Sequence, residues 1–195
     1  NMNKVLITGG TGFLGSHITK RIIDDVESIT IATTDIRQKT TLKSLGVDID
    51  KINLVKGDVR DLKLMKGLVE GKDVVIHLAA YVGFPICRLK GQKESYSLNT
   101  EATDKLVKMM TDEQYLLFGS TGSNYGEVIG LCTEETPLNP LSIYGKTKTE
   151  AEQIAPCLNY YQYHLKGISL LPRHDYGAYQ QMPYEAIDEK TYESE

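Results

Sequence analysis

The stretch that decides the fold is KVLITGGTGFLG at residues 4–15. Its opening, KVLIT, is largely apolar and suits a buried strand, and the residues after the glycines repeat apolar side chains at a helical period. The turn between them contains Gly9, Gly12 and Gly15, in the spacing G-x-x-G-x-x-G. Glycines here allow a tight turn and a close backbone approach to a pyrophosphate, which free N–H groups of the helix start would face. The stretch predicts a strand–turn–helix unit that binds a dinucleotide.

Apolar runs and amphipathic segments alternate along the rest of the chain. The sequence predicts strands at 4–8, 28–33, 52–55, 73–77, 115–120 and 167–171, and helices at 13–25, 37–45, 61–69, 93–110 and 144–155. This order predicts a parallel sheet with helices on both faces. Near-continuous apolar strands fit, because strands of such sheets are buried on both sides. The predicted fold class is α/β, a Rossmann-type doubly wound parallel sheet.

Composition narrows the class of protein. The 195 residues are 41% hydrophobic and 25% charged, with a net charge of −4. This suits one α/β domain with a core and argues against a nucleic-acid partner. No apolar run reaches the roughly 18 residues of a membrane span, and three distant cysteines make no disulfide framework. We expect a cytoplasmic protein with reduced thiols and no membrane partner. No metal is expected, because the histidines lack ligand spacing.

Charged residues after the second and third predicted strands bear on the choice of cofactor. Asp35 can bind a ribose hydroxyl of NAD, whereas Arg37 can bind the 2′-phosphate of NADP. Asp58 can accept a hydrogen bond from an adenine amino group. Asp35 and Arg37 can also be solvated loop charges, and Asp58 can also be a cap of the following helix, although the N-cap position suits Asp61 better. The sequence favours NAD and leaves NADP open.

Tyr144 and Lys148 lie one helical turn apart in a predicted helix. A nearby ammonium lowers the pKa of a phenol, so Tyr144 is a candidate base for a hydroxyl proton while a hydride leaves the same carbon. Taken alone, the Y-x-x-x-K spacing also occurs by chance on solvated helix faces. Thr121 follows the fifth predicted strand, at the edge of the sheet where ligands of doubly wound folds bind.

Six segments together carry a family resemblance. They are TGGTGFLG (8–15), GDVRD (57–61), VIHLAA (75–80), NTEAT (99–103), TGSNYG (121–126) and ETPLNPLSIYGKTK (135–148). In this order the chain resembles the extended short-chain dehydrogenase/reductases, specifically the nucleotide-sugar epimerase and dehydratase group. The resemblance spans about residues 4–177. One segment alone would be a weak signal, but six in register are specific.

The resemblance implies a role for each matched residue. It assigns cofactor binding to Gly9, Gly12, Phe13, Leu14, Gly15, Asp58, Val59, Ala79, Ala80, Tyr81 and Lys148, with Asn99 beside the active site. It implies that Tyr144 is the catalytic base and that Lys148 binds the nicotinamide ribose and lowers the pKa of that tyrosine. It also implies that Thr121 donates a hydrogen bond to the reacting sugar oxygen as it becomes a carbonyl.

Two departures from the family pattern refine the expected function. The related dehydratases carry Asp-Glu after the active-site Thr, and those groups transfer the extra protons that elimination of water needs. Gly122 and Ser123 occupy these positions and cannot transfer protons near neutral pH, so dehydration is disfavoured. At the C-terminus, LLPRH at 170–174 departs from the family, and the substrate lobe is mostly absent from the chain. We therefore expect a dinucleotide-binding domain at 1–177 and a tail or lobe remnant at 178–195.

The expected function is that of an NAD(P)-dependent nucleotide-sugar epimerase with reversible hydride transfer. Two alternatives stay open: a keto-sugar reductase or dehydrogenase with net turnover of the cofactor, and a non-catalytic dinucleotide-binding protein. The expected small-molecule partner is a nucleotide sugar. The resemblance further implies a homodimer through the helices at 93–110 and 144–155.

Overall fold

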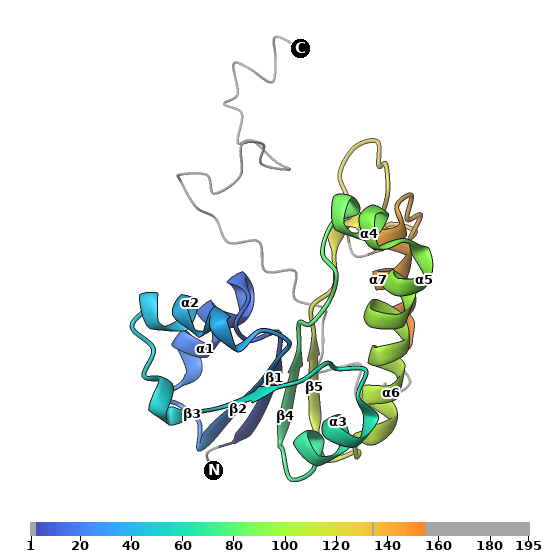
Figure 1. The fold of residues 1–195 in the computed structure, drawn as a ribbon. Helices are drawn as coiled ribbons and strands as arrows, with labels where there is room; N and C mark the ends of the chain where they lie inside the picture. The colour runs from blue at the N-terminus through green and yellow to red at the C-terminus, as the bar shows by residue number, and fades with distance from the viewer. Residues whose placement is uncertain (1–2, 134, 155–195) are drawn as a thin grey trace.

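The structure is a computed structural model that describes residues 3–133 and 135–154, and it contains a parallel sheet with helices on both sides (Figure 1). The strands are β1 (Lys4–Thr8), β2 (Ser28–Thr33), β3 (Ile52–Lys56), β4 (Val74–His77) and β5 (Tyr115–Phe118). Their order is β3-β2-β1-β4-β5, and all neighbours are parallel. The chain winds outward from β1 in one direction and then in the other, which confirms the predicted fold class.

Seven α-helices accompany the sheet in the described part of the chain. They are α1 (Phe13–Ile22), α2 (Lys39–Ser44), α3 (Leu62–Val69), α4 (Phe84–Lys90), α5 (Gln92–Tyr96), α6 (Ala102–Met109) and α7 (Ile143–Ile154). Single 3₁₀ turns occur at Ile36–Gln38, Ile49–Lys51 and Gly122–Asn124, and a π-helical turn at Ser97–Glu101 joins α5 to α6.

Apolar side chains fill both faces of the sheet. On one face Ile31 of β2 packs in a cluster with Leu42 of α2, and α1 adds partly buried side chains. On the other face Leu6 of β1 clusters with Met65 of α3 and Leu106 of α6. Figure 1 shows α1 and α2 on one side of the sheet and α3 and α6 on the other. Burial on both faces explains why the strands read as continuous apolar runs.

Several element boundaries differ from the sequence prediction. Helix α1 ends at Ile22 and strand β5 at Phe118, so both are shorter than predicted. Helix α4 was not among the predicted helices; its Pro85 lies in the first turn, where a missing N–H is not needed. The expected strand at 167–171 and the boundary at residue 177 lie outside the described residues.

The long helix predicted at 93–110 is three segments. A π-helical turn at Ser97–Glu101 interrupts it, and the N–H of Ala102 bonds to the carbonyl of Ser97, five residues back. Such turns insert one residue into a helix and are frequent at functional sites. Periodicity alone predicted the helix but not the extra residue within it.

Candidate active site

The β1–α1 turn has the backbone geometry that a pyrophosphate site needs. Gly9 has a φ of +71° and lies against the backbone of Ala79, which a Cβ on Gly9 would meet at 3.0 Å. A Cβ on Gly15 would lie 2.4 Å from the carbonyl oxygen of Gly9. Gly12 differs, because its Cβ would meet only that same oxygen, at 3.3 Å, among the described residues. The outer side of Gly12 is therefore open for close approach of a ligand to the backbone.

The remaining residues assigned to the cofactor by resemblance lie at the same edge of the sheet. Phe13 opens α1 and is 49% exposed, whereas Val59 after β3 is buried. Ala79 and Ala80 lie just beyond the end of β4, after Leu78, and Leu14 lies in the first turn of α1. The carboxyl ends of parallel strands thus bring these residues to one edge.

The switch point of the sheet lies between β1 and β4. Thr8 pairs with His77 in the register of these strands, and the Thr8 hydroxyl lies 2.7 Å from Nδ1 of His77. The other ring nitrogen of His77 is 3.1 Å from the hydroxyl of Thr103 on α6. Burial, with a smaller contribution from the charge of Lys148, lowers the pKa of His77 to about 3. His77 is therefore a neutral group that fixes the switch point, where ligands of such folds bind.

Both aspartates considered for the adenosine half of the cofactor are engaged by an arginine two residues on. The backbone N–H and Nε of Arg37 donate to Oδ1 of Asp35, and a terminal nitrogen donates to Oδ2. Arg60 binds Asp58 with the same pattern of atoms. These hydrogen bonds lower the pKa of each carboxyl group. The assigned roles at ribose and adenine stay predictions.

Arg60 also connects Asp58 to helix α5. Its other terminal nitrogen donates to Glu94 at 2.7 Å, and the phenol of Tyr81 donates to the same carboxylate oxygen at 3.2 Å. The sequence reasoning missed Arg60 and Glu94. The D-x-R spacing, present twice after successive strands, is the signal that marks the arginines.

Asn99 lies in the π-helical turn and is buried. Its side chain accepts from the N–H of Tyr81 at 2.8 Å and donates to the Tyr81 carbonyl at 3.0 Å. It also donates to the hydroxyl of Thr147 on α7 at 3.1 Å. Asn99 thus ties the loop after β4 to the helix that carries Tyr144 and Lys148.

Tyr144 and Thr121 come together at this edge although they lie on different elements. Burial raises the pKa of Tyr144, and a side-chain hydrogen bond with Thr121 partly opposes this. The structure thus differs from the expectation that the phenol has a lowered pKa. The reason is physical: Tyr144 is half-buried, and a phenolate is less well solvated there than a phenol.

Lys148 is 3% exposed, and its Nζ lies 3.8 Å from the ring centroid of Phe118 on β5. Burial lowers its pKa to about 7, against the opposing charge of Glu152 one turn further along α7. Sequence reasoning missed Glu152, although its position, four residues after Lys148, is a readable signal.

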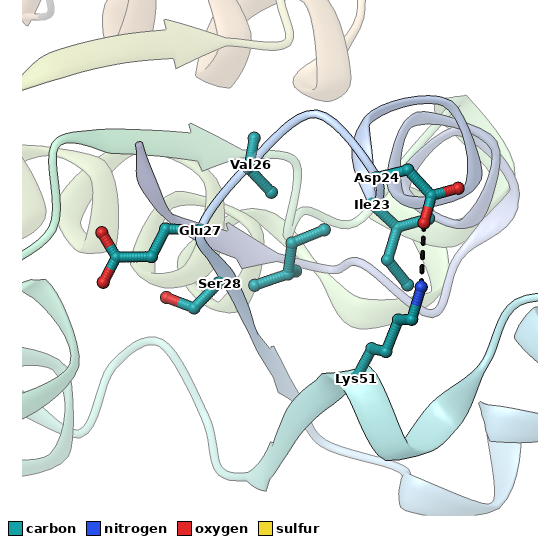
Figure 2. Close-up of a pocket in the computed structure, with 7 residues that line it drawn as sticks. Ile23, Asp24, Val26, Glu27, Ser28 and Lys51 are labelled. Atoms are coloured by element: carbon teal, nitrogen blue, oxygen red, sulfur yellow. Dashed lines mark hydrogen bonds and ion pairs between the residues drawn. The ribbon is translucent and has the colours of Figure 1, made fainter. Parts of the chain in front are cut away.

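A separate hollow of about 340 Å³ lies at the other end of the sheet, where β2 begins (Figure 2). Its lining includes Asp24 and Lys51, whose side chains form an ion pair at 3.0 Å. It contains none of the residues of the candidate active site. Within residues 3–133 and 135–154, no group of His, Cys, Asp and Glu side chains could hold a metal ion. No helix among these residues is long and apolar enough to cross a membrane.

The fold and the glycine turn define a doubly wound protein of the dinucleotide-binding class. The sequence matches the NAD dependent epimerase/dehydratase family over residues 5–190, and the chain belongs to this family. The family resemblance inferred from the six sequence segments is therefore confirmed.

Curated relatives and solved structures agree with this assignment. The chain is 32% identical to a UDP-glucose 4-epimerase from Lactobacillus helveticus, over 77% of this chain and 46% of the relative. It is 29% identical to the uncharacterized protein 052L of Frog virus 3, over 88% of this chain and 48% of the relative. The chain spans about half the length of the curated relatives it matches.

Two solved structures illustrate the similarity of fold. One is the UDP-Glc/GlcNAc 4-epimerase from Campylobacter jejuni, with a TM-score of 0.73 and 25% identity over 81% of this chain and 49% of that one. The other is the UDP-glucuronic acid 4-epimerase from Bacillus cereus in complex with UDP-glucuronic acid and NAD, with a TM-score of 0.72 and 25% identity over 82% and 53%. NAD, the expected cofactor, is the cofactor named for the family and present in this neighbour.

Proposed function

We propose that this chain is the cofactor-binding part of an NAD-dependent nucleotide-sugar epimerase, with Tyr144 as its base. The observation that carries the proposal is the meeting of Thr121 and Tyr144 at the edge of the sheet that also holds the glycine turn. Lys148 lies on the same face of α7 as Tyr144, one turn away. A hydroxyl, a phenol and an amine at this edge are the groups that oxidation of a sugar hydroxyl needs.

The glycine turn would hold the pyrophosphate of NAD. Gly12 leaves its backbone open, and helix α1 begins directly after it, so free N–H groups at the helix start would face the anion. Bound NAD would supply the acceptor and donor of hydride. Lys148 would bind the nicotinamide ribose, as the family resemblance implies. NADP is the alternative cofactor, because the exposed side chain of Arg37 after β2 could bind its 2′-phosphate.

Proton transfer would be the task of Tyr144. Its phenol oxygen would take the proton of the sugar hydroxyl and later return it, while the hydroxyl of Thr121 donates a hydrogen bond to the reacting oxygen. Burial disfavours the phenolate, so the positive charge of Lys148 would have to offset this penalty. Tyr144 would therefore depend on the charge of Lys148 to act as a base.

Epimerisation fits these residues better than dehydration. Gly122 and Ser123 follow Thr121 in a 3₁₀ turn, and neither carries an acid or a base. One proton relay and a reversible hydride transfer suffice for epimerisation. The relatives that act on UDP-sugars make a UDP-hexose the first substrate to test.

The test is incubation of the protein with NAD and UDP-glucose or UDP-glucuronic acid, followed by NMR of the sugar. Inversion at one carbon with no net change in absorbance at 340 nm supports the epimerase. Net change at 340 nm with a keto-sugar instead supports a reductase or dehydrogenase. Nucleotide binding without turnover of any UDP-sugar contradicts both enzymes and favours a binding protein.

We also propose a homodimer through α5, α6 and α7. Helices α5 and α7 are joined by a hydrogen bond of 2.8 Å from the Tyr96 phenol to Glu150. A hollow of about 520 Å³ on α5 and the adjoining π-helical turn includes Tyr96 and Glu101 in its lining. Light scattering at micromolar concentration should give twice the chain mass, and a monomer would contradict the proposal.

A further inference from the structure

Helix α7 carries three ionisable side chains at a spacing of four residues. Tyr144, Lys148 and Glu152 therefore share one face of the helix. Glu152 is half-buried on this face. Glu150, the neighbouring acid, is exposed and accepts from Tyr96 of α5 instead.

The Glu152 carboxylate binds the turn that carries Thr121. One of its oxygens accepts from the hydroxyl of Ser120 and from the side-chain amide of Asn124. The Asn124 oxygen in turn accepts from the hydroxyl of Thr149 on α7 at 2.9 Å. Ser120 and Asn124 stand on either side of Thr121, so α7 holds both ends of this turn.

The surroundings of Lys148 determine how strongly the charge of Glu152 affects its amine. No carboxylate lies within ion-pair distance of Lys148 in the described part of the chain. The charge of Lys148 acts on His77 of β4, but His77 itself is neutral at pH 7, and the ring of Phe118 on β5 carries no net charge. Tyr144 on the same helix is a neutral phenol at this pH. Glu152 is the acidic group whose charge acts on the buried amine.

We propose that Glu152 is a positioning residue, whose carboxylate fixes the Thr121 turn against α7 one helical turn from the buried Lys148 amine. The negative charge at this position should favour the charged form of that amine. The inference rests on the proposed function for the roles of Thr121 and Lys148. Its physical content is narrower: one carboxylate couples the turn to the helix and opposes the loss of a proton from a buried lysine.

The test is a pH titration of Lys148 followed by the chemical shift of its ¹³Cε in lysine-labelled protein. Lys148→Arg identifies the signal. In the unchanged protein the midpoint should lie near pH 7. In Glu152→Gln the negative charge is lost, so the cation is less favoured and the midpoint should fall by about one pH unit. Glu152→Asp keeps the charge and should fall less.

Glu150→Gln is the matched control, because it removes one negative charge from the same helix on another face. It should leave the Lys148 midpoint unchanged. An unchanged midpoint in Glu152→Gln would overturn the proposal. An equal fall in both glutamine variants would also overturn it, since the effect would then come from net charge alone.

A second measurement needs no substitution and covers the case in which Glu152→Gln does not fold. Coupled groups sense each other's titration, so the ¹³Cδ shift of Glu152 should show an inflection at the Lys148 midpoint. Absence of this inflection overturns the proposal. Neither titration uses a sugar. A protein inactive toward every UDP-sugar would therefore contradict the proposed function and leave this inference standing.

Discussion

The two halves of the ligand-binding edge are built differently. After β2 and β3, Asp35 and Asp58 are each bound by an arginine two residues on, and these side chains are partly exposed, by 30–35% except for Arg37 at 92%. After β4 and β5, His77 and Lys148 are buried and depend on neutral hydrogen bonds, a ring and one distant carboxylate. Solvated ion pairs contribute little to stability, whereas buried polar groups are costly when left unpaired. Substitutions should therefore have larger effects on the β4–β5 side.

The largest effect should come from Tyr144→Phe. Loss of the phenol oxygen removes the proton acceptor, so turnover should fall by about 10²–10⁴-fold. Dinucleotide affinity should stay nearly unchanged, as titration calorimetry with NAD can show. Tyr115→Phe is the control, because Tyr115 lies exposed at the start of β5. Wild-type turnover in Tyr144→Phe would show that the β4–β5 side does not carry the chemistry.

The next effect is a loss of stability in acid caused by His77. Its pKa is lowered from 6.5 to about 3 in the folded chain, so below pH 6.5 the unfolded chain binds a proton that the folded chain does not. The free energy of unfolding should thus fall as pH drops from 6.5 toward 3, by about 1.4 kcal/mol per pH unit. Urea unfolding at several pH values measures this slope.

His77→Gln should flatten that slope, since the group that titrates is gone. His17→Gln is the control, because His17 is exposed on α1. A slope that is the same in His77→Gln and in the unchanged protein would place the acid sensitivity elsewhere.

Gly15→Ala tests the close backbone packing of the glycine turn, which lies between the β2–β3 side and the β4–β5 side. The added methyl group would lie 2.4 Å from the Gly9 carbonyl oxygen, a backbone atom that cannot rotate away. Unfolding should become easier by about 1–3 kcal/mol. Gly67→Ala in α3, where a Cβ meets nothing within 4 Å, should instead stabilise by about 0.5–1 kcal/mol. Equal melting temperatures of the two variants would contradict the close approach.

The smallest effects should come from the arginines of the β2–β3 side. Arg60→Ala should destabilise by less than about 1 kcal/mol, because the Asp58 pair is partly solvated. Arg37→Ala should leave the melting temperature unchanged, because Arg37 is 92% exposed. It should weaken binding of NADP more than of NAD if Arg37 meets the 2′-phosphate. If Arg37→Ala had a lower melting temperature than His77→Gln, the β2–β3 side would be the more sensitive one, contrary to expectation.

Local signals in the sequence predicted much of this architecture. The glycine turn, the parallel sheet and the N-cap at Asp61, whose side chain accepts from the N–H of Leu64 at 3.0 Å, depend on residues close together in the chain. Helix α4 and the π-helical turn were not predicted. Helix α4 has seven residues, too few to show a clear helical period, and the extra residue near Asn99 becomes apparent only in the packed structure.

For the candidate site, the sequence predicted which residues lie there but not all of their contacts. The residues at its edge follow from strand ends, but the direction of the Tyr144 pKa does not, since it depends on burial. The partners of Asp35 and Asp58 were within reach as a D-x-R spacing. The contact of Glu94 with Arg60 was not predictable in this way, because the two residues are 34 positions apart in the sequence.

The π-helical turn has a consequence for how this chain tolerates changes of length. The extra residue at Ser97–Glu101 rotates α5 relative to α6, so that Asn99 faces Tyr81 and Thr147 while Leu106 still faces the core. Removal of a single residue here would restore a regular helix and keep its length almost unchanged. It would also rotate one helix relative to the other, so that either Asn99 or Leu106 would lose its contacts. The number of residues in this turn therefore sets the rotation between the two helices. A deletion here would keep the helices but turn the residues of the site away from their partners.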